Sequence, residues 1–209
     1  GVVHQIYNNA GIAYNGDVED TTFKDLERVM DVDFWGVVNG TKAFLPYLIE
    51  SGDGHVVNVS SAGVQANSPK YSAYLPSKAA LDAFSEVVGT ETLSDHITFT
   101  NIHMPLVETP MIAPSKRLNP MPPITAEHAA AMVVRGLVDK PARIDTPLGT
   151  LGDLGNYLTP KLSRRVLHQL YLGYPDSAAA RGIAETSPPA DLPDRPRSPR
   201  RPKRPLAVK

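Results

Sequence analysis

The chain contains no cysteine among its 209 residues, which excludes disulfide bonds and thiolate metal sites and suits the reducing cytoplasm, where we place the protein. Its six histidines form no HxxxH or HExxH pattern, so we expect packing or surface roles for them and no metal site. No apolar run is long enough to cross a bilayer, and the first residues do not have the pattern of a signal peptide. A net charge of −1 predicts no general attraction to nucleic acid.

Proline and positive charge are concentrated at the carboxyl end. Residues 185–209 contain seven basic side chains, three acidic side chains and seven prolines. Proline removes backbone donors and blocks helical geometry, and few apolar side chains are present to offset the entropy of ordering. We therefore predict a folded portion at 1–180 and a disordered Pro/Arg-rich tail at 181–209. The alternative is a basic arm for nucleic acid, but no aromatic residue alternates with the arginines, so we predict no specific nucleic-acid partner.

Apolar strand patterns and amphipathic helix patterns alternate along the folded portion. Strands are predicted at 2–7, 55–60 and 96–104, with a short one within 142–149. Helices are predicted at 21–52, 72–93, 125–140 and 157–174. Thr22 and Asp25 have capping spacing at the start of the first helix, and Ser72 is the expected cap of the second. Nearly continuous apolar strands separated by helices indicate an α/β fold, a doubly wound parallel sheet with both faces covered.

Polar or proline-bearing segments coincide with the ends of three predicted strands: Asn8–Gly11, Ser60–Ser61 and Met104–Thr109. The carboxyl ends of parallel strands meet at one edge of the sheet, and ligands of such sheets bind there. This edge is therefore the predicted site.

Tyr74 and Lys78 are four residues apart in a predicted helix, so both side chains can point into one cleft. A neighbouring ammonium favours the phenolate and lowers the pKa of a tyrosine, which can then exchange a proton with a carbonyl or hydroxyl oxygen. Ser61, at the end of the preceding strand, can hold the same oxygen. The alternative is that YxxxK is a common surface pattern on helices without any chemical role.

The segments NNAG (Asn8–Gly11), NVSS (Asn58–Ser61) and YxxxK (Tyr74–Lys78), in this order and at these intervals, resemble the short-chain dehydrogenase/reductase family. The similarity covers about residues 2–149. It implies a Rossmann-like fold and NAD(P)(H)-dependent reduction of an aldehyde or ketone, or oxidation of an alcohol. It also implies that Ser61 orients the substrate oxygen, that Tyr74 is the general acid or base, and that Lys78 lowers the pKa of Tyr74 and binds the nicotinamide ribose.

The same resemblance implies the other contacts of the cofactor. The turn formed by Asn8, Asn9, Ala10 and Gly11 would support the sheet and lie near the adenosine side. After the third predicted strand, Pro105, Val107 and Thr109 would border the nicotinamide amide, and the loop at 111–121 would cover the substrate. By resemblance alone we favour NADP over NAD, and a homo-oligomer that pairs the helices carrying Asp33 and Tyr74.

The chain departs from the family pattern at two single positions. Asp33 stands where the fourth catalytic residue is usually asparagine; that role uses a main-chain carbonyl, so we keep Asp33 as catalytic and note that its carboxylate would shift the pKa values of the proton relay. Leu106 replaces the usual glycine after Pro105, which either narrows the backbone or favours an apolar substrate. The sequence DVDFWGVVNGTKAFLP resembles that of bacterial fatty acyl-CoA and long-chain aldehyde reductases.

The largest departure is the missing TGxxxGxG loop, which would supply backbone N–H groups to the cofactor pyrophosphate. We therefore predict an N-terminally truncated fold that begins at about the fourth strand of the family's sheet. Two functions follow: a short-chain reductase whose activity requires the absent portion, or a non-catalytic remnant or oligomerising interaction protein that binds no cofactor alone.

Overall fold

The computed structural model describes residues 1–112 and 122–174. The tail predicted at 181–209, and most of the loop predicted to cover the substrate, lie outside the described residues.

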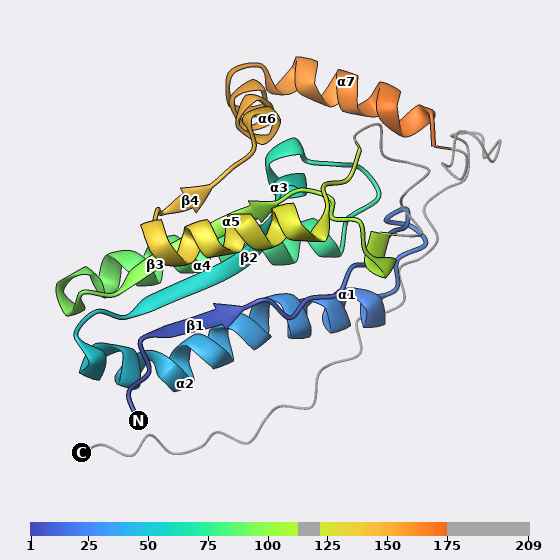
Figure 1. The fold of residues 1–209 in the computed structure, drawn as a ribbon. Helices are drawn as coiled ribbons and strands as arrows, with labels where there is room; N and C mark the ends of the chain where they lie inside the picture. The colour runs from blue at the N-terminus through green and yellow to red at the C-terminus, as the bar shows by residue number, and fades with distance from the viewer. Residues whose placement is uncertain (113–121, 175–209) are drawn as a thin grey trace.

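Four strands form one parallel sheet in the order of the chain (Figure 1). They are β1 (Gln5–Asn8), β2 (His55–Ser61), β3 (Thr98–Met104) and β4 (Arg143–Ile144). The predicted parallel α/β sheet is therefore confirmed. Its register places Asn8 opposite Asn58 and Asn58 opposite Asn101, so three asparagines form a row across the sheet.

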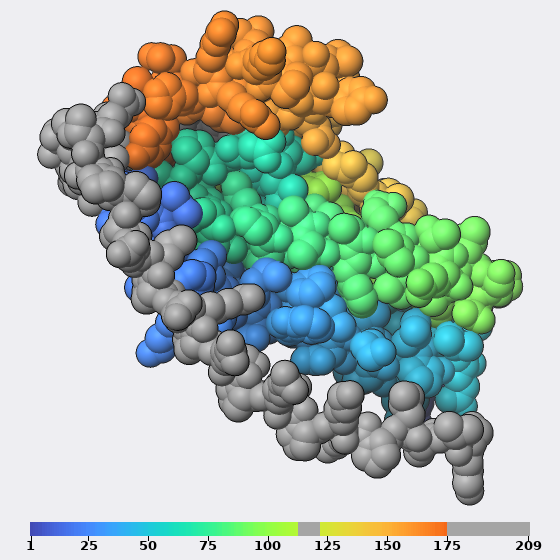
Figure 2. Space-filling view, turned by 180° about the vertical axis from the view of Figure 1, so that it is seen from behind, coloured from blue at the N-terminus to red at the C-terminus, as the bar shows by residue number. Residues whose placement is uncertain are grey.

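The strands are connected by helices in all three crossovers. The described helices are α1 (Phe23–Met30), η1 (Asp31–Trp35), α2 (Gly36–Ser51), α3 (Ala62–Ala66), α4 (Tyr74–Glu91), η2 (Leu93–Asp95), η3 (Pro110–Ile112), α5 (Ala126–Asp139), α6 (Pro147–Leu158) and α7 (Pro160–Leu172). α2 and α4 cover one face of the sheet, and α5 covers the other (Figure 1). Seen from behind in Figure 2, the surface over the first face is formed by α2 and α4.

Alternating side chains of the strands supply both halves of the core. Val56 is fully buried and packs against Leu48 of α2, whereas its neighbour Val57 points to the opposite face and packs with Ile102 and with Met132 of α5. This alternation follows from the two-residue period of a strand, and it explains why the strands read as continuous apolar runs.

The first predicted helix, 21–52, is three consecutive segments. Its start is as expected: Thr22 caps α1, Oγ1 accepts a hydrogen bond from the Asp25 N–H at 3.2 Å, and the Asp25 carboxylate accepts one from the Thr22 N–H. Its end is also as expected, since Gly52 adopts a left-handed conformation with φ 75°. The middle differs, because η1 is a single π-helical turn.

The predicted cap of the second helix is wrong. α4 begins at Tyr74, and the residue before it, Ala73, offers no side-chain cap. Ser72 therefore lies just outside the helix, and its Oγ has no hydrogen-bond partner among the described residues.

The region expected to hold a short strand at 142–149 contains β4 and then the start of a helix that the sequence did not predict. Thr146 caps α6, and Pro147 occupies its first turn. Three glycines, at 149, 152 and 155, lower the helix propensity of this segment. They are tolerated because α6 packs closely on α3: a side chain at Gly149 would overlap the Gln65 side chain, and one at Gly152 would lie 3.3 Å from the Gln65 carbonyl oxygen.

Candidate active site

The predicted catalytic residues come together at the carboxyl end of the sheet. Ser61 is the last residue of β2 and also the cap of α3, with Oγ accepting a hydrogen bond from the Gly63 N–H at 3.2 Å. Tyr74 opens α4, and Lys78 follows one turn later. Ser61 lies close to the Tyr74 side chain, and hydrogen bonding from Ser61 acts to lower the pKa of Tyr74.

Lys78 is only 4% exposed, and its ammonium has three neighbours. Nζ donates to the Val59 carbonyl oxygen at 3.0 Å, lies 3.8 Å from Asp33 Oδ2, and lies 5.8 Å from the centre of the Tyr74 ring. The lysine therefore connects the strand end, the π-helical turn and the tyrosine.

Asp33 is fully buried in η1. The Gly36 N–H donates to the Asp31 carbonyl, five residues back, and a π turn of this kind changes the direction in which the enclosed side chains point. The Asp33 carboxylate accepts a hydrogen bond from the Ile12 N–H at 2.8 Å, and Ser77 Oγ lies 3.5 Å from its other oxygen. It thus fixes the turn after β1 to the catalytic helix, a role that sequence reasoning missed.

The pKa of Tyr74 is raised, whereas the sequence led us to expect a lowered value. Burial raises the pKa of Tyr74 to about 12; the hydrogen bond from Ser61 lowers it, and the negative charge of Asp33 raises it further. The expected lowering by Lys78 is absent from this structure. The physical reason is that burial also lowers the pKa of Lys78, so that its ammonium has already lost its proton at the high pH at which Tyr74 ionises.

Asp33 and Lys78 are both shifted towards their neutral forms. Burial raises the pKa of Asp33, although the Lys78 charge and the Ile12 N–H oppose this. Burial lowers the pKa of Lys78, although the charges of Asp33 and Asp82 oppose this. The pair is thus a buried, closely balanced ion pair at the centre of the site.

The turn predicted to contact the cofactor has two different halves. Asn8 is half-buried, and its amide donates to Asn58 Oδ1 at 2.7 Å, so this residue braces the sheet. Asn9 and Ala10 are exposed. Gly11 lies against the site, because a Cβ placed there would lie 3.2 Å from Lys78 Nζ.

The asparagine row is a buried polar network that sequence reasoning did not assign. Asn58 Nδ2 donates to Ser85 Oγ at 2.7 Å and to Asn101 Oδ1 at 3.3 Å. The signal was present in the sequence, because each of the first three strands carries an asparagine. These hydrogen bonds hold β1, β2, β3 and α4 in register directly beneath the site.

The segment after β3 contains the residues predicted to border the nicotinamide. Pro105 and Val107 are half-buried, whereas Thr109 is exposed and its hydroxyl donates to the Val107 carbonyl at 3.3 Å. Val107 also forms a parallel bridge with Ile124, which fixes this segment to the residues before α5. All three lie beyond the carboxyl end of β3, where the sequence placed them.

His103 forms a buried bridge that the sequence did not reveal. Its Nδ1 lies 2.6 Å from Asp145 Oδ1, just before α6, and its Nε2 lies 3.0 Å from Asp82 Oδ2, one turn after Lys78 in α4. Burial alone would lower the pKa of His103, but the hydrogen bonds and charges of Asp82 and Asp145 outweigh it and raise the pKa above its usual value. The bridge joins α4, β3 and the start of α6.

His55 is buried at the opposite end of the sheet and is neutral. The Thr100 hydroxyl donates its only proton to the Pro141 carbonyl at 2.6 Å, so it must accept from His55 Nε2 at 2.9 Å. His55 Nδ1 then has no hydrogen-bond partner within the described residues. Burial, followed by the charge of Lys140, lowers the pKa of His55 to about 4. This is a packed histidine, as the sequence predicted.

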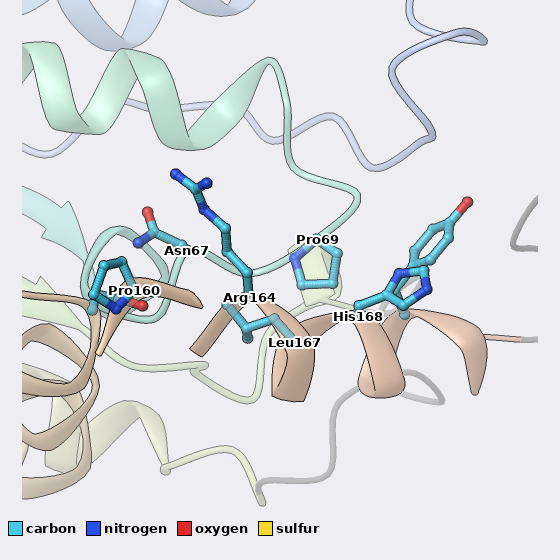
Figure 3. Close-up of a pocket in the computed structure, with 8 residues that line it drawn as sticks. Asn67, Pro69, Pro160, Arg164, Leu167 and His168 are labelled. Carbon is cyan, nitrogen blue, oxygen red and sulfur yellow. The ribbon is translucent and has the colours of Figure 1, made fainter. Parts of the chain in front are cut away.

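Two cavities lie next to the segment that links Ser61 to Tyr74. The larger, which we call the α7 cavity, has a volume of about 520 Å³ and lies between that segment and helices α6 and α7 (Figure 3). The smaller has about 280 Å³ and shares Tyr171 with it. Within residues 1–112 and 122–174 there is no cluster of side chains suited to a metal ion, and none of the helices there is long and apolar enough to cross a membrane.

Comparison with known proteins identifies the family. Residues 1–119 match the family model described as short chain dehydrogenase. A fatty acyl-CoA reductase of Acinetobacter baylyi is 39% identical over 182 residues, covering 86% of this chain and 62% of the relative. The putative oxidoreductase SadH of Mycobacterium tuberculosis is 60% identical over 93 residues, covering 44% of this chain and 34% of the relative.

Solved structures show the same fold. The crystal structure of a short chain dehydrogenase from Burkholderia cenocepacia in complex with NADP has a TM-score of 0.69 at 21% identity, with 78% of this chain and 68% of that chain covered. The chain covers less than two thirds of the length of the Acinetobacter reductase. Because the family model matches more than half of its residues, the chain belongs to the short chain dehydrogenase family.

Proposed function

We propose that the protein reduces an aldehyde or ketone, or oxidises the corresponding alcohol, with NADP(H) or NAD(H), and that Tyr74 transfers the proton. The observation that carries the proposal is the convergence of Ser61, Tyr74 and Lys78 at the carboxyl end of a parallel sheet, with Ser61 near enough to the tyrosine to lower its pKa. A hydroxyl pair of this kind can hold a carbonyl oxygen and protonate it.

The pKa of Tyr74, raised to about 12, favours the reducing direction. At neutral pH the phenol keeps its proton and can donate it to the substrate oxygen as negative charge develops there. Ser61 donates a second hydrogen bond to the same oxygen. After the transfer, the Lys78 ammonium stabilises the phenolate that remains.

The residues present fit the nicotinamide half of a dinucleotide. Of the three N–H groups of Lys78, one donates to the Val59 carbonyl and one faces Asp33, which leaves one without a described acceptor. A ribose hydroxyl is a suitable acceptor for it. When bound, the cofactor supplies the hydride; Lys78, Gly11 and the segment Pro105–Thr109 supply the walls that position it.

An apolar carbonyl substrate and a homo-oligomer complete the proposal. The similarity to a fatty acyl-CoA reductase supports a long-chain substrate, as does Leu106 beside the site. The face formed by η1, α2 and α4 exposes large side chains, with Trp35 50%, Tyr47 52% and Val87 57% exposed (Figure 2). A second copy of the chain could bury this face.

The test is Tyr74→Phe in the protein at its native length, with Tyr71→Phe as the control. Tyr71 is a matched neighbour, with its ring centre 6.1 Å from that of Tyr74. We expect Tyr74→Phe to reduce turnover of a long-chain aldehyde by about 10²- to 10⁴-fold, the usual contribution of a general acid, and Tyr71→Phe to retain most of it. Undiminished turnover in Tyr74→Phe would contradict the role. Stable oligomers without nicotinamide binding would favour the non-catalytic alternative.

A further inference from the structure

The α7 cavity has two walls of different origin (Figure 3). Asn67 and Pro69 belong to the segment between Ser61 and Tyr74, and they form the wall nearest the proposed active site. Arg164, Leu167 and His168, all from α7, form the opposite wall. A ligand in this cavity therefore lies against the segment that carries both proposed catalytic hydroxyls at its ends.

No acidic side chain lines the cavity in the part of the chain that the structure describes. The lining residues are Asn67, Pro69, Asn156, Pro160, Arg164, Leu167, His168 and Tyr171, and none of them is acidic. α7 itself carries Lys161, Arg164, Arg165 and His168 without a single Asp or Glu. Figure 3 shows the Arg164 side chain extending from α7 between Asn67 and Pro69. Arg164 forms no ion pair with any described residue, so its guanidinium is available to an anion.

The rest of the lining is apolar or aromatic. Pro69, Pro160 and Leu167 contribute apolar surface, and the His168 ring stacks on Tyr171 with 6.2 Å between ring centres. A volume of about 520 Å³ is within the usual range for an organic ligand and exceeds what one small anion needs. The ligand that fits is an organic molecule that carries an anionic group.

The neighbouring smaller cavity has the opposite character. Asp17 and Glu19 contribute to its lining, and its cation, Lys70, lies 3.8 Å from Asp17 Oδ2. An anion is therefore directed to the α7 cavity, on the Arg164 side of Tyr171, and is disfavoured on the other side.

We propose that the α7 cavity binds a phosphate-bearing group, with Arg164 holding the phosphate and with Pro69, Leu167 and Tyr171 packing on the organic portion. Phosphate is the preferred anion because it carries more negative charge than a carboxylate and has oxygens that a planar guanidinium binds bidentately. The group is part of the carbonyl substrate, as in a ketone on an acyl chain that is attached to a phosphorylated carrier. The phosphate site is argued from the cavity alone, whereas the assignment of the bound group to the substrate rests on the reductase function proposed above.

Direct binding tests the site. Titration calorimetry on the protein at its native length would compare coenzyme A, NADP and decanoate as probes, in wild type, Arg164→Gln and Arg165→Gln. Arg165 is the matched control, because it is the next residue of α7, carries the same charge and does not line the cavity. We expect Arg164→Gln to weaken binding of coenzyme A by about tenfold and Arg165→Gln to weaken it by less than about twofold. Raising the salt from about 0.05 to about 0.5 M should also weaken wild-type binding.

The other possible results of these experiments would each overturn a defined part of the proposal or leave it standing. Equal losses in the two arginine variants would overturn it, since they would indicate a diffuse charge effect. Binding of decanoate as strong as that of coenzyme A would overturn the phosphate class. A loss for NADP but not for coenzyme A would assign the phosphate to the cofactor instead of the substrate. If Tyr74→Phe retained activity while Arg164→Gln lost coenzyme A binding, the reductase mechanism would fail and the phosphate site would stand.

Discussion

Replacing Asp33 by asparagine should lower the pKa of Tyr74. The negative charge of Asp33, which raises the pKa of Tyr74, is removed. The Lys78 ammonium loses its partner at the same time and gives up its proton more readily, which limits the fall. The substitution keeps the size of the side chain and leaves an oxygen to accept the Ile12 N–H, so the fold of the π turn should be preserved.

The magnitude follows from the charge that is removed. Asp33 lies beside Lys78, whose Nζ is 5.8 Å from the centre of the Tyr74 ring, and at an effective dielectric constant of about 20 a unit charge at such a distance is worth about 3 kcal/mol, or about two pH units in the pKa of the phenol. We treat this as an upper limit, because removing Asp33 also lowers the pKa of Lys78 and so reduces its charge at high pH. The pKa of Tyr74 should therefore fall from about 12 to between about 10 and about 11.

NMR titration of tyrosines labelled at Cζ measures this pKa directly, with Tyr74→Phe to assign the signal. Asp31→Asn is the control, because Asp31 lies in the same π turn but is exposed. It should leave the pKa of Tyr74 unchanged. An unchanged or higher pKa of Tyr74 in Asp33→Asn would refute the argument that the charge of Asp33 raises the pKa of the tyrosine.

Three further predictions concern stability. The pKa of His55 is about 4 in the fold and about 6.5 in the unfolded chain, so the stability that neutral His55 contributes is present above pH 6.5 and is lost as the pH falls towards 4. Chemical denaturation should show that the free energy of unfolding falls by about 3 kcal/mol over this range, and His55→Gln should largely abolish the fall. The same pH dependence in His55→Gln as in wild type would contradict the buried neutral imidazole. The pKa of His103 is raised, so its contribution is present below about pH 6.5 and is lost as the pH rises through the folded value; denaturation of His103→Gln should lack this slope, and retention of it would contradict the bridge. Gly149→Ala should destabilise the fold by about 1–3 kcal/mol because the new methyl group meets a buried side chain, whereas Gly155→Ala in the same helix should stabilise it by up to about 1 kcal/mol; equal effects on the thermal midpoint would contradict the close packing of α6.

The helix and strand pattern was predictable where local signals and tertiary packing agree. The capping pair Thr22 and Asp25, the glycine at 52 and the apolar strand runs all lie where the sequence indicated. α6 was missed because its glycines argue locally against a helix, and only the close approach of Gln65 in α3 explains why they are there. The π turn was missed for a similar reason, since no local signal at Asp33 distinguishes it from an ordinary helical residue.

The sequence by itself determined the family, the parallel sheet and the identity of Ser61, Tyr74 and Lys78 as site candidates, because spacing along a strand or helix fixes which side chains can share a face. Only the tertiary structure decided which charges meet. It pairs Lys78 with Asp33, 45 positions away along the chain, and bridges His103 to carboxylates on two other elements. The pKa of Tyr74 depends on burial and on the nearby charge of Asp33, and neither is encoded in the spacing of the YxxxK motif.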